Sequence, residues 1–224
     1  MNETTQRTVP SRLDTSTMPR GPLNWIFSPL ALLYHELLLR AFDTQNDFFR
    51  GTLVLVTLFS LATGLLLSLL ANLLHNRKLA WVLTLVVTVL WTLLLCVEYC
   101  CRSYFKSYFS VGFICTMAGN VVTGFGSTIP GVVLQRLPFI ILALLPLVLC
   151  ILLRKRIVTE YRMSKWSLLF VTAVSVVFLV IGEVLAHRGT YGDSYTYNFQ
   201  TDAAVSQFGL HTAVRLEAEY AVFG

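Results

Sequence analysis

Long apolar runs separated by short polar connections dominate the chain, and four of them span residues 52–74, 79–97, 137–153 and 166–186. Each run is about long enough to cross a hydrocarbon layer roughly 30 Å thick at ~1.5 Å per helical residue. A helix satisfies its own backbone hydrogen bonds in lipid. The pattern therefore predicts an all-α integral membrane protein.

A fifth stretch, 108–133, is less apolar and contains several glycines and Pro130. Charge decides whether it crosses, because cytoplasmic loops are enriched in Lys and Arg. With this crossing, twelve of the 17 Lys and Arg lie inside and five outside, whereas without it seven lie inside and ten outside. If residues 24–43 crossed as well, nine Lys and Arg would lie inside and eight outside. We therefore expect five spans.

The densest cluster of positive charge connects the runs 137–153 and 166–186. We place this connection in the cytosol, which gives a cytosolic amino terminus and an external carboxyl terminus. The formal charge of +5 is spread between apolar runs. That distribution argues against nucleic acid as a partner and favours membrane lipids. The residues that set this topology are Arg154, Lys155, Arg156, Arg162 and Lys165.

Residues 24–43 predict an amphipathic helix that precedes the spans. Ser28 and Pro29 suit a helix start, as N-cap and first helical residue. Beyond them the apolar positions recur at helical spacing, while His35, Glu36 and Arg40 mark a polar side. Because three ionisable groups make a poor span, we expect this helix to lie along the inner membrane surface.

The rest of the chain divides around the five-span membrane domain, which we place at 44–187. Residues 1–23 contain no apolar run and predict a disordered cytosolic tail. Residues 188–224 are polar and aromatic, and we expect an extracellular segment that leads to a further domain absent from this sequence.

Small residues recur every four positions on two neighbouring spans. In lipid, such residues let helix backbones approach closely. We expect the two stripes to face each other; the alternative is that small residues fall there by chance on lipid-facing surfaces. The packing residues are Ser60, Gly64 and Ser68 on 52–74 and Ala80, Thr84 and Thr88 on 79–97.

Asn120 lies in the middle of 108–133, where a polar side chain must face protein or water. One interpretation is close helix packing among the glycines. The other is a lipid-headgroup pocket that opens outward near Asn120 and Arg136, because an arginine can bind a lipid phosphate.

Catalytic motifs are absent. The sequence contains no HExxH or GxSxG motif, no phosphate-binding loop and no metal-ligand spacing. We therefore assign no catalytic residue and no metal ligand, and predict that this chain alone is not a complete enzyme.

Three stretches together resemble the amino-terminal membrane region of lipoteichoic acid synthase-like proteins, the polyglycerolphosphate synthases of Gram-positive bacteria. The stretches are 24–42, 97–129 and 198–224. The resemblance implies a bacterial cell membrane protein that anchors an extracellular sulfatase-type domain, in cis or in trans. It also implies phosphatidylglycerol as the glycerol phosphate donor. A divalent metal, usually manganese, would belong to that domain, together with a threonine nucleophile.

Two other functions fit the same sequence. One is a self-sufficient transporter or flippase subunit built around the polar 108–133 segment. The other is a structural membrane scaffold. Only one interrupted segment and no internal repeat are found, whereas transporters commonly carry a pair.

Overall fold

The computed structural model of the protein describes residues 23–43, 52–74, 77–116, 129–157, 165–188, 192, 195 and 200–223. These residues form helices and contain no strand, which confirms the all-α prediction. The helices are α1 (Leu23–Phe42), α2 (Leu53–Leu73), α3 (Arg77–Phe105), α5 (Ile129–Gln135), α6 (Leu137–Ala143), α7 (Leu145–Leu152), α8 (Arg154–Ile157), α9 (Lys165–Arg188), α11 (Thr201–Phe208) and α12 (Leu210–Phe223), and residues 111–116 form a further helical segment.

Three helices are long and apolar enough to cross a membrane, namely α2, α3 and α9. They coincide with the predicted runs 52–74, 79–97 and 166–186. The 21 residues of α2 extend about 30 Å at ~1.5 Å per residue. The fold is thus compatible with a membrane protein.

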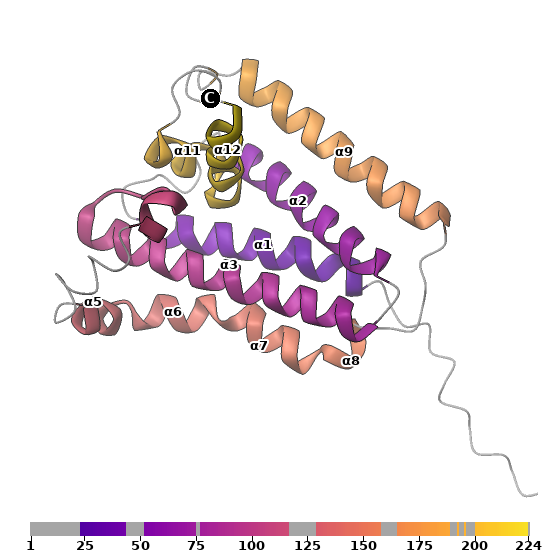
Figure 1. Cartoon of the computed structure of the whole chain (residues 1–224), viewed down its shortest axis with the longest axis horizontal. Coiled ribbons are helices and arrows are strands. Elements are labelled where there is room, and N and C mark those ends of the chain that lie inside the picture. The colour runs from indigo at the N-terminus through magenta and orange to yellow at the C-terminus, as the bar shows by residue number, and fades with distance from the viewer. Residues whose placement is uncertain are drawn as a thin grey trace, which may run out of the picture.

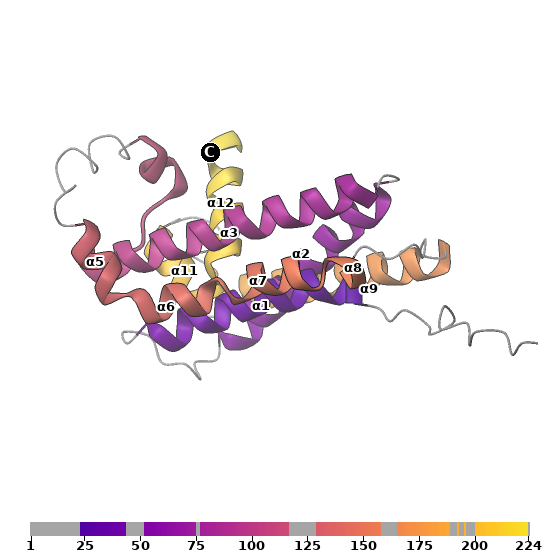
Figure 2. The same ribbon diagram turned by 90° about the horizontal axis from the view of Figure 1, so that it is seen from below.

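Helices α1 and α3 run lengthwise beside the broken rod α6–α7–α8, and α2 and α9 lie on the other side of α1 (Figures 1 and 2). The rod runs opposite to α3, because Arg136 lies over Tyr99 near one end and Arg154 over Trp81 near the other. Helices α11 and α12 lie where α1 finishes and α2 begins, and we name this the docking end. The opposite end, where α9 begins, is named the basic end.

The predicted run 137–153 is helical, but it is broken at Leu144. Pro146 has no N–H, so the carbonyl of Leu142 loses its usual partner four residues on. The Tyr34 hydroxyl of α1 donates to that carbonyl at 2.9 Å. The next carbonyl, of Ala143, lies 3.0 Å from His35 Nε2. Side chains of α1 thus satisfy the backbone at the break.

The expected surface helix at 24–43 is α1, and it lies inside the bundle (Figure 1). Its polar side is buried: His35 is 1% exposed and Glu36 3%. Protein groups thus surround the polar side chains that we expected to need water, and the location of this helix at the membrane surface stays a prediction. No membrane is present in the structure to place α1 further.

The predicted span 108–133 does not carry the chain from one end of the bundle to the other. The Tyr108 hydroxyl donates to Asp43 at 3.0 Å, at the docking end. Arg136, just after the segment, lies over Tyr99 near the same end. Both described ends of the segment thus lie at the docking end, and a crossing by 108–133 stays a prediction. Its middle, with Asn120, lies outside the described residues, as does the predicted tail 1–22.

The small-residue stripe on α2 contacts α1 rather than the stripe on α3. A Cβ added at Gly64 would lie 2.3 Å from Pro29 Cα. The Ser68 hydroxyl donates to the Trp25 carbonyl at 3.1 Å, and Ser60 is fully buried. On α3, Thr84 and Thr88 border a cavity shared with α1 and α2, and Ala80 is half-buried. The expected mutual contact of the stripes is corrected, because α1 occupies that position.

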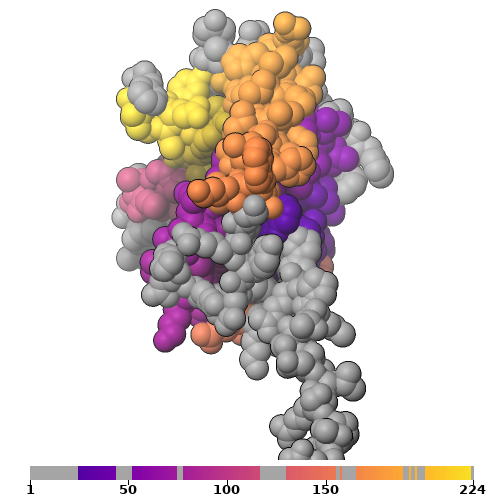
Figure 3. Space-filling view, turned by 90° about the vertical axis from the view of Figure 1, so that its right-hand side faces the viewer, coloured from indigo at the N-terminus to yellow at the C-terminus, as the bar shows by residue number. Residues whose placement is uncertain are grey.

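Helix α9 packs on α2 through its own small residues. The Ser175 hydroxyl donates to the Ala62 carbonyl at 3.0 Å, and a Cβ at Gly182 would lie 2.9 Å from the Phe59 ring. Only 17% of the most apolar window of α9 is buried by protein. Figure 3, viewed from the basic end, shows α9 (orange) along one edge of the molecule. The remaining apolar face is free to meet lipid.

Candidate functional site

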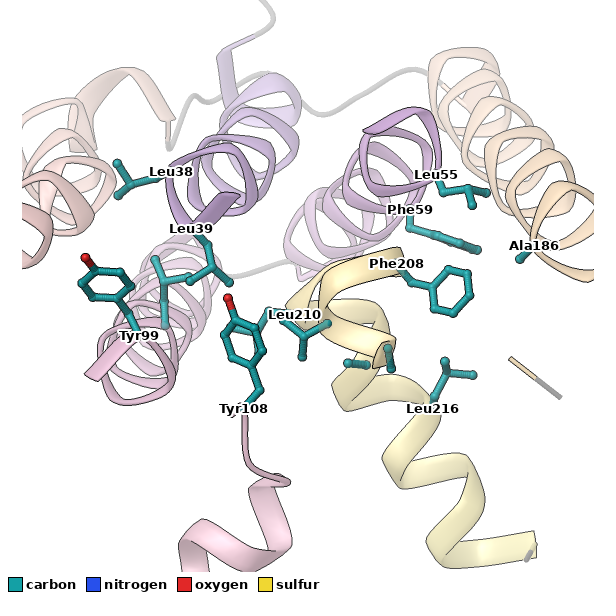
Figure 4. Packing of buried hydrophobic residues seen from close by; sticks show 14 of the residues in the cluster. Leu38, Leu39, Leu55, Phe59, Tyr99, Tyr108, Ala186, Phe208, Leu210 and Leu216 are labelled. Carbon is teal, nitrogen blue, oxygen red and sulfur yellow. The ribbon is translucent and has the colours of Figure 1, made fainter. Parts of the chain in front are cut away.

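Helices α11 and α12 form an integral part of the core at the docking end. Phe208 and Leu210 are buried on either side of the break between them. Phe208 lies near Phe59 of α2 and Ala186 of α9 (Figure 4). Helices α11 and α12 are therefore packed into the bundle and do not form a separate tail.

Glu36 of α1 binds the first turn of α12. Its carboxylate accepts the backbone N–H groups of Leu210 at 3.0 Å and His211 at 2.9 Å. The same carboxylate lies 2.6 Å from His211 Nδ1. The first N–H groups of a helix have no partner within the helix and favour negative charge. A carboxylate from α1 thus serves as the amino-terminal cap of α12.

Gly209 is needed for this contact. Its φ of 91° lies in the region that residues with a Cβ rarely adopt. A Cβ would also lie 2.8 Å from Glu36 Oε2. The absence of a Cβ at Gly209 thus allows the carboxylate to reach the backbone.

Gly209→Ala should lower the free energy of unfolding by about 2 kcal/mol, because a φ of 91° with a ψ of 162° is a conformation that essentially only glycine adopts. Thermal unfolding in detergent, followed by tryptophan fluorescence, measures the change. An unchanged midpoint would show that the turn at this position does not depend on glycine.

A second polar network lies beside the first. Arg102 of α3 lies 2.7 Å from Asp202 of α11 and 3.5 Å from Asp43, which follows α1. Asp202 also accepts the backbone N–H of Tyr108 at 3.0 Å. Asp202 lies in the first turn of α11 and binds α3 through Arg102.

Tyr108 closes this network as a neutral donor. Burial, with the neighbouring Asp43 carboxylate, raises the pKa of its phenol above the ordinary value. The hydroxyl therefore stays protonated at neutral pH and donates to Asp43. Together these contacts fasten α1, α3 and α11 to one another.

Glu217 of α12 caps the start of another helix in the same way as Glu36 caps α12. It accepts the backbone N–H groups of Val111 and Gly112, each at 2.8 Å. These residues begin the helical segment 111–116. Hence α1 caps α12, and α12 in turn caps 111–116.

A third group lies between α9 and α12. Glu183 accepts hydrogen bonds from Tyr195 and Arg215, each at 2.7 Å, and Arg215 also bonds the Tyr195 hydroxyl. Burial, with the bond to Glu183, raises the pKa of Tyr195, so this phenol also remains a donor. These contacts tie α9 to α12.

The predicted lipid contact is described only at Arg136. Its guanidinium carbon lies 5.9 Å from the centre of the Tyr99 ring, and no described residue offers its buried Nε a hydrogen-bond acceptor. Asn120 lies outside the described residues. Among the topology residues, Arg154 lies 4.3 Å from the centre of the Trp81 ring, and Arg162 falls outside the described part.

Sequence reasoning missed the contact of Glu36 with α12. The separation of 175 positions between Glu36 and His211 hides it from any local pattern. One signal was present, namely the neighbouring ionisable residues His35 and Glu36 inside an apolar helix. Such a pair is as consistent with a buried polar partner as with a helix at the membrane surface.

Within the described ranges no group of three or more His, Cys, Asp or Glu side chains could hold a metal ion. No family model, characterised protein or solved structure matches the chain.

Proposed function

We propose that the chain is the membrane region of a lipoteichoic acid synthase-like glycerol phosphate transferase. It would anchor an extracellular sulfatase-type domain, in cis or in trans, and orient it against the membrane. The observation that carries this proposal is the capping of α12 by the buried carboxylate of Glu36. A domain attached beyond α12 would be held in a fixed orientation relative to the bundle, whereas an unpacked tail would let that domain move freely.

The distribution of charge supports the docking end as the external one. Ten of the 17 Lys and Arg precede α1 in the sequence, lie at the start of α3, or lie between Arg154 and Lys165. Helices α1, α3 and α9 begin at the basic end. Of the seven others, Arg102 and Arg215 form ion pairs inside the protein. The excess of Lys and Arg thus favours a cytosolic basic end and a cytosolic amino terminus.

Cysteine labelling of intact cells tests this orientation. A background without the five native cysteines carries one new cysteine, at Tyr161 or at Ser194. A membrane-impermeant maleimide should label position 194 and leave position 161 unlabelled. The opposite pattern would contradict the orientation.

Arg136 is our candidate contact for a phosphatidylglycerol headgroup. Within the described residues its guanidinium has no carboxylate partner, unlike Arg102 and Arg215 at the same end. Arginine binds phosphate through two parallel N–H donors, and stacking on Tyr99 would hold its plane in place.

Arg136→Ala should weaken binding of phosphatidylglycerol by about tenfold, the effect of losing one charge-assisted hydrogen bond. Native mass spectrometry of the detergent-solubilised chain, titrated with phosphatidylglycerol, measures this. Arg188→Ala, which removes an exposed cation at the same end, is the matched control and should change binding little. Equal binding by wild type and Arg136→Ala would remove this residue from the lipid contact.

A transporter or flippase subunit is the second candidate, and the break between α6 and α7 favours it. Interrupted helices commonly form transporter sites. A fluorescent-lipid scrambling assay in proteoliposomes separates the two functions. Lipid movement by this chain alone supports the transporter, whereas an in-frame sulfatase-type domain in the DNA after the Gly224 codon supports the anchor.

A further inference from the structure

A cavity of about 30 Å³ lies between α1, α2 and α3. Most of its lining is aliphatic. The polar groups that border it are His35 and Ser28 of α1 and Thr84 and Thr88 of α3. It is separate from the polar networks that bind α12.

The protonation of His35 follows from its partner. The imidazole Nε2 lies 3.0 Å from the Ala143 carbonyl oxygen, which can only accept. In the neutral ring Nε2 therefore carries the proton, and Nδ1 is an acceptor. His35 is 1% exposed, and no described group donates to Nδ1. A buried acceptor of this kind requires a donor.

The neighbouring threonines cannot supply that donor. The Thr88 hydroxyl donates to the Thr84 carbonyl at 2.7 Å, and the Thr84 hydroxyl donates to the Ala80 carbonyl at 3.0 Å. Each hydroxyl has a single proton, so both present only acceptor oxygens to the cavity. The group that fits must be small, neutral and able to donate twice.

We propose that this cavity is a binding site for ordered water, which donates one hydrogen bond to His35 Nδ1 and another to the Thr88 hydroxyl oxygen. One water needs at least about 10–15 Å³ of such space, so the cavity holds one or two. The bound water links α1 to α3 inside an apolar bundle. It explains how the buried imidazole of His35 is accommodated in this bundle. The proposal does not depend on whether a further domain is attached at the docking end.

Nuclear magnetic resonance of the chain in micelles, with ¹⁵N-labelled histidine, tests the site. We expect the neutral tautomer of His35 protonated at Nε2, with cross peaks from water to the imidazole and to Thr88. Xenon under pressure should leave the neighbouring leucine methyl signals unchanged, because xenon enters dry apolar cavities. Xenon-induced shifts at Leu32 and Leu83 without water cross peaks would overturn the proposal.

A matched pair of variants isolates the contribution of the hydroxyl. Thr88→Val keeps the shape but removes the acceptor, so the water cross peak to His35 should disappear and xenon should now enter. Thr172→Val is the control, since its hydroxyl also donates to its own helix, at 2.9 Å, but Thr172 does not line the cavity. Loss of the water signal in both variants, or in neither, would contradict the assignment.

Discussion

Glu36→Gln should lower the free energy of unfolding by about 3 kcal/mol, the usual effect of breaking a buried charged pair. The carboxylate accepts three contacts, from two backbone N–H groups and from His211. An amide offers one oxygen, and its NH₂ group would face N–H donors. We therefore expect α12 to separate from α1 before the rest of the bundle unfolds.

Trp91 gives a local signal for this separation, because its ring centre lies 6.2 Å from that of His211. Equilibrium unfolding in mixed micelles, followed by tryptophan fluorescence, measures the change. Glu219→Gln is the control on the same helix: Glu219 is 53% exposed and pairs with Arg215 at 3.5 Å, so about 0–1 kcal/mol is expected. Equal effects of the two variants would show that burial of Glu36 contributes nothing.

Gly64→Ala should destabilise the bundle by about 3 kcal/mol, at the upper end of overpacking effects. The new Cβ would lie 2.3 Å from Pro29 Cα and 2.6 Å from Pro29 N. These are backbone atoms, so no side-chain rotation can relieve the contact. Helices α1 and α2 would have to move apart along their shared interface.

Gly131→Ala is the matched control, because it is also helical but has no atom within 4 Å of its added Cβ. It should leave stability unchanged or raise it by up to ~1 kcal/mol through helix propensity. Unfolding of each variant in mixed micelles gives the comparison. If Gly64→Ala were as stable as wild type, the close approach of α1 and α2 would be wrong.

The long helices could be predicted from sequence, because length and apolarity alone identify a helix able to cross lipid. The run 79–97 was predicted too short, since α3 continues to Phe105. Its last turns contain Glu98 and Arg102, and such charged residues normally indicate the end of a membrane-spanning run. In the fold, Glu98 accepts the Phe109 N–H at 3.2 Å, and Arg102 pairs with Asp202.

The roles of 24–43 and 108–133 could not be predicted by counting charges. The count treated Arg102 and Arg215 as loop residues that meet water, although carboxylates inside the protein bind both. The three ionisable groups of 24–43 also argued against a lengthwise helix, since the partner of Glu36 lies near the far end of the sequence and no local pattern shows it. A local pattern shows where ionisable groups are, but not which distant groups neutralise them.

Hydrogen exchange at the start of α12 tests the central claim, that a carboxylate of α1 fastens the carboxyl-terminal helices to the bundle. The amides of Leu210 and His211 both donate to Glu36. In the wild-type chain in nanodiscs they should exchange as slowly as amides in the middle of α2, and Glu36→Gln should accelerate both. Rapid exchange at these two amides in the wild type would contradict the account.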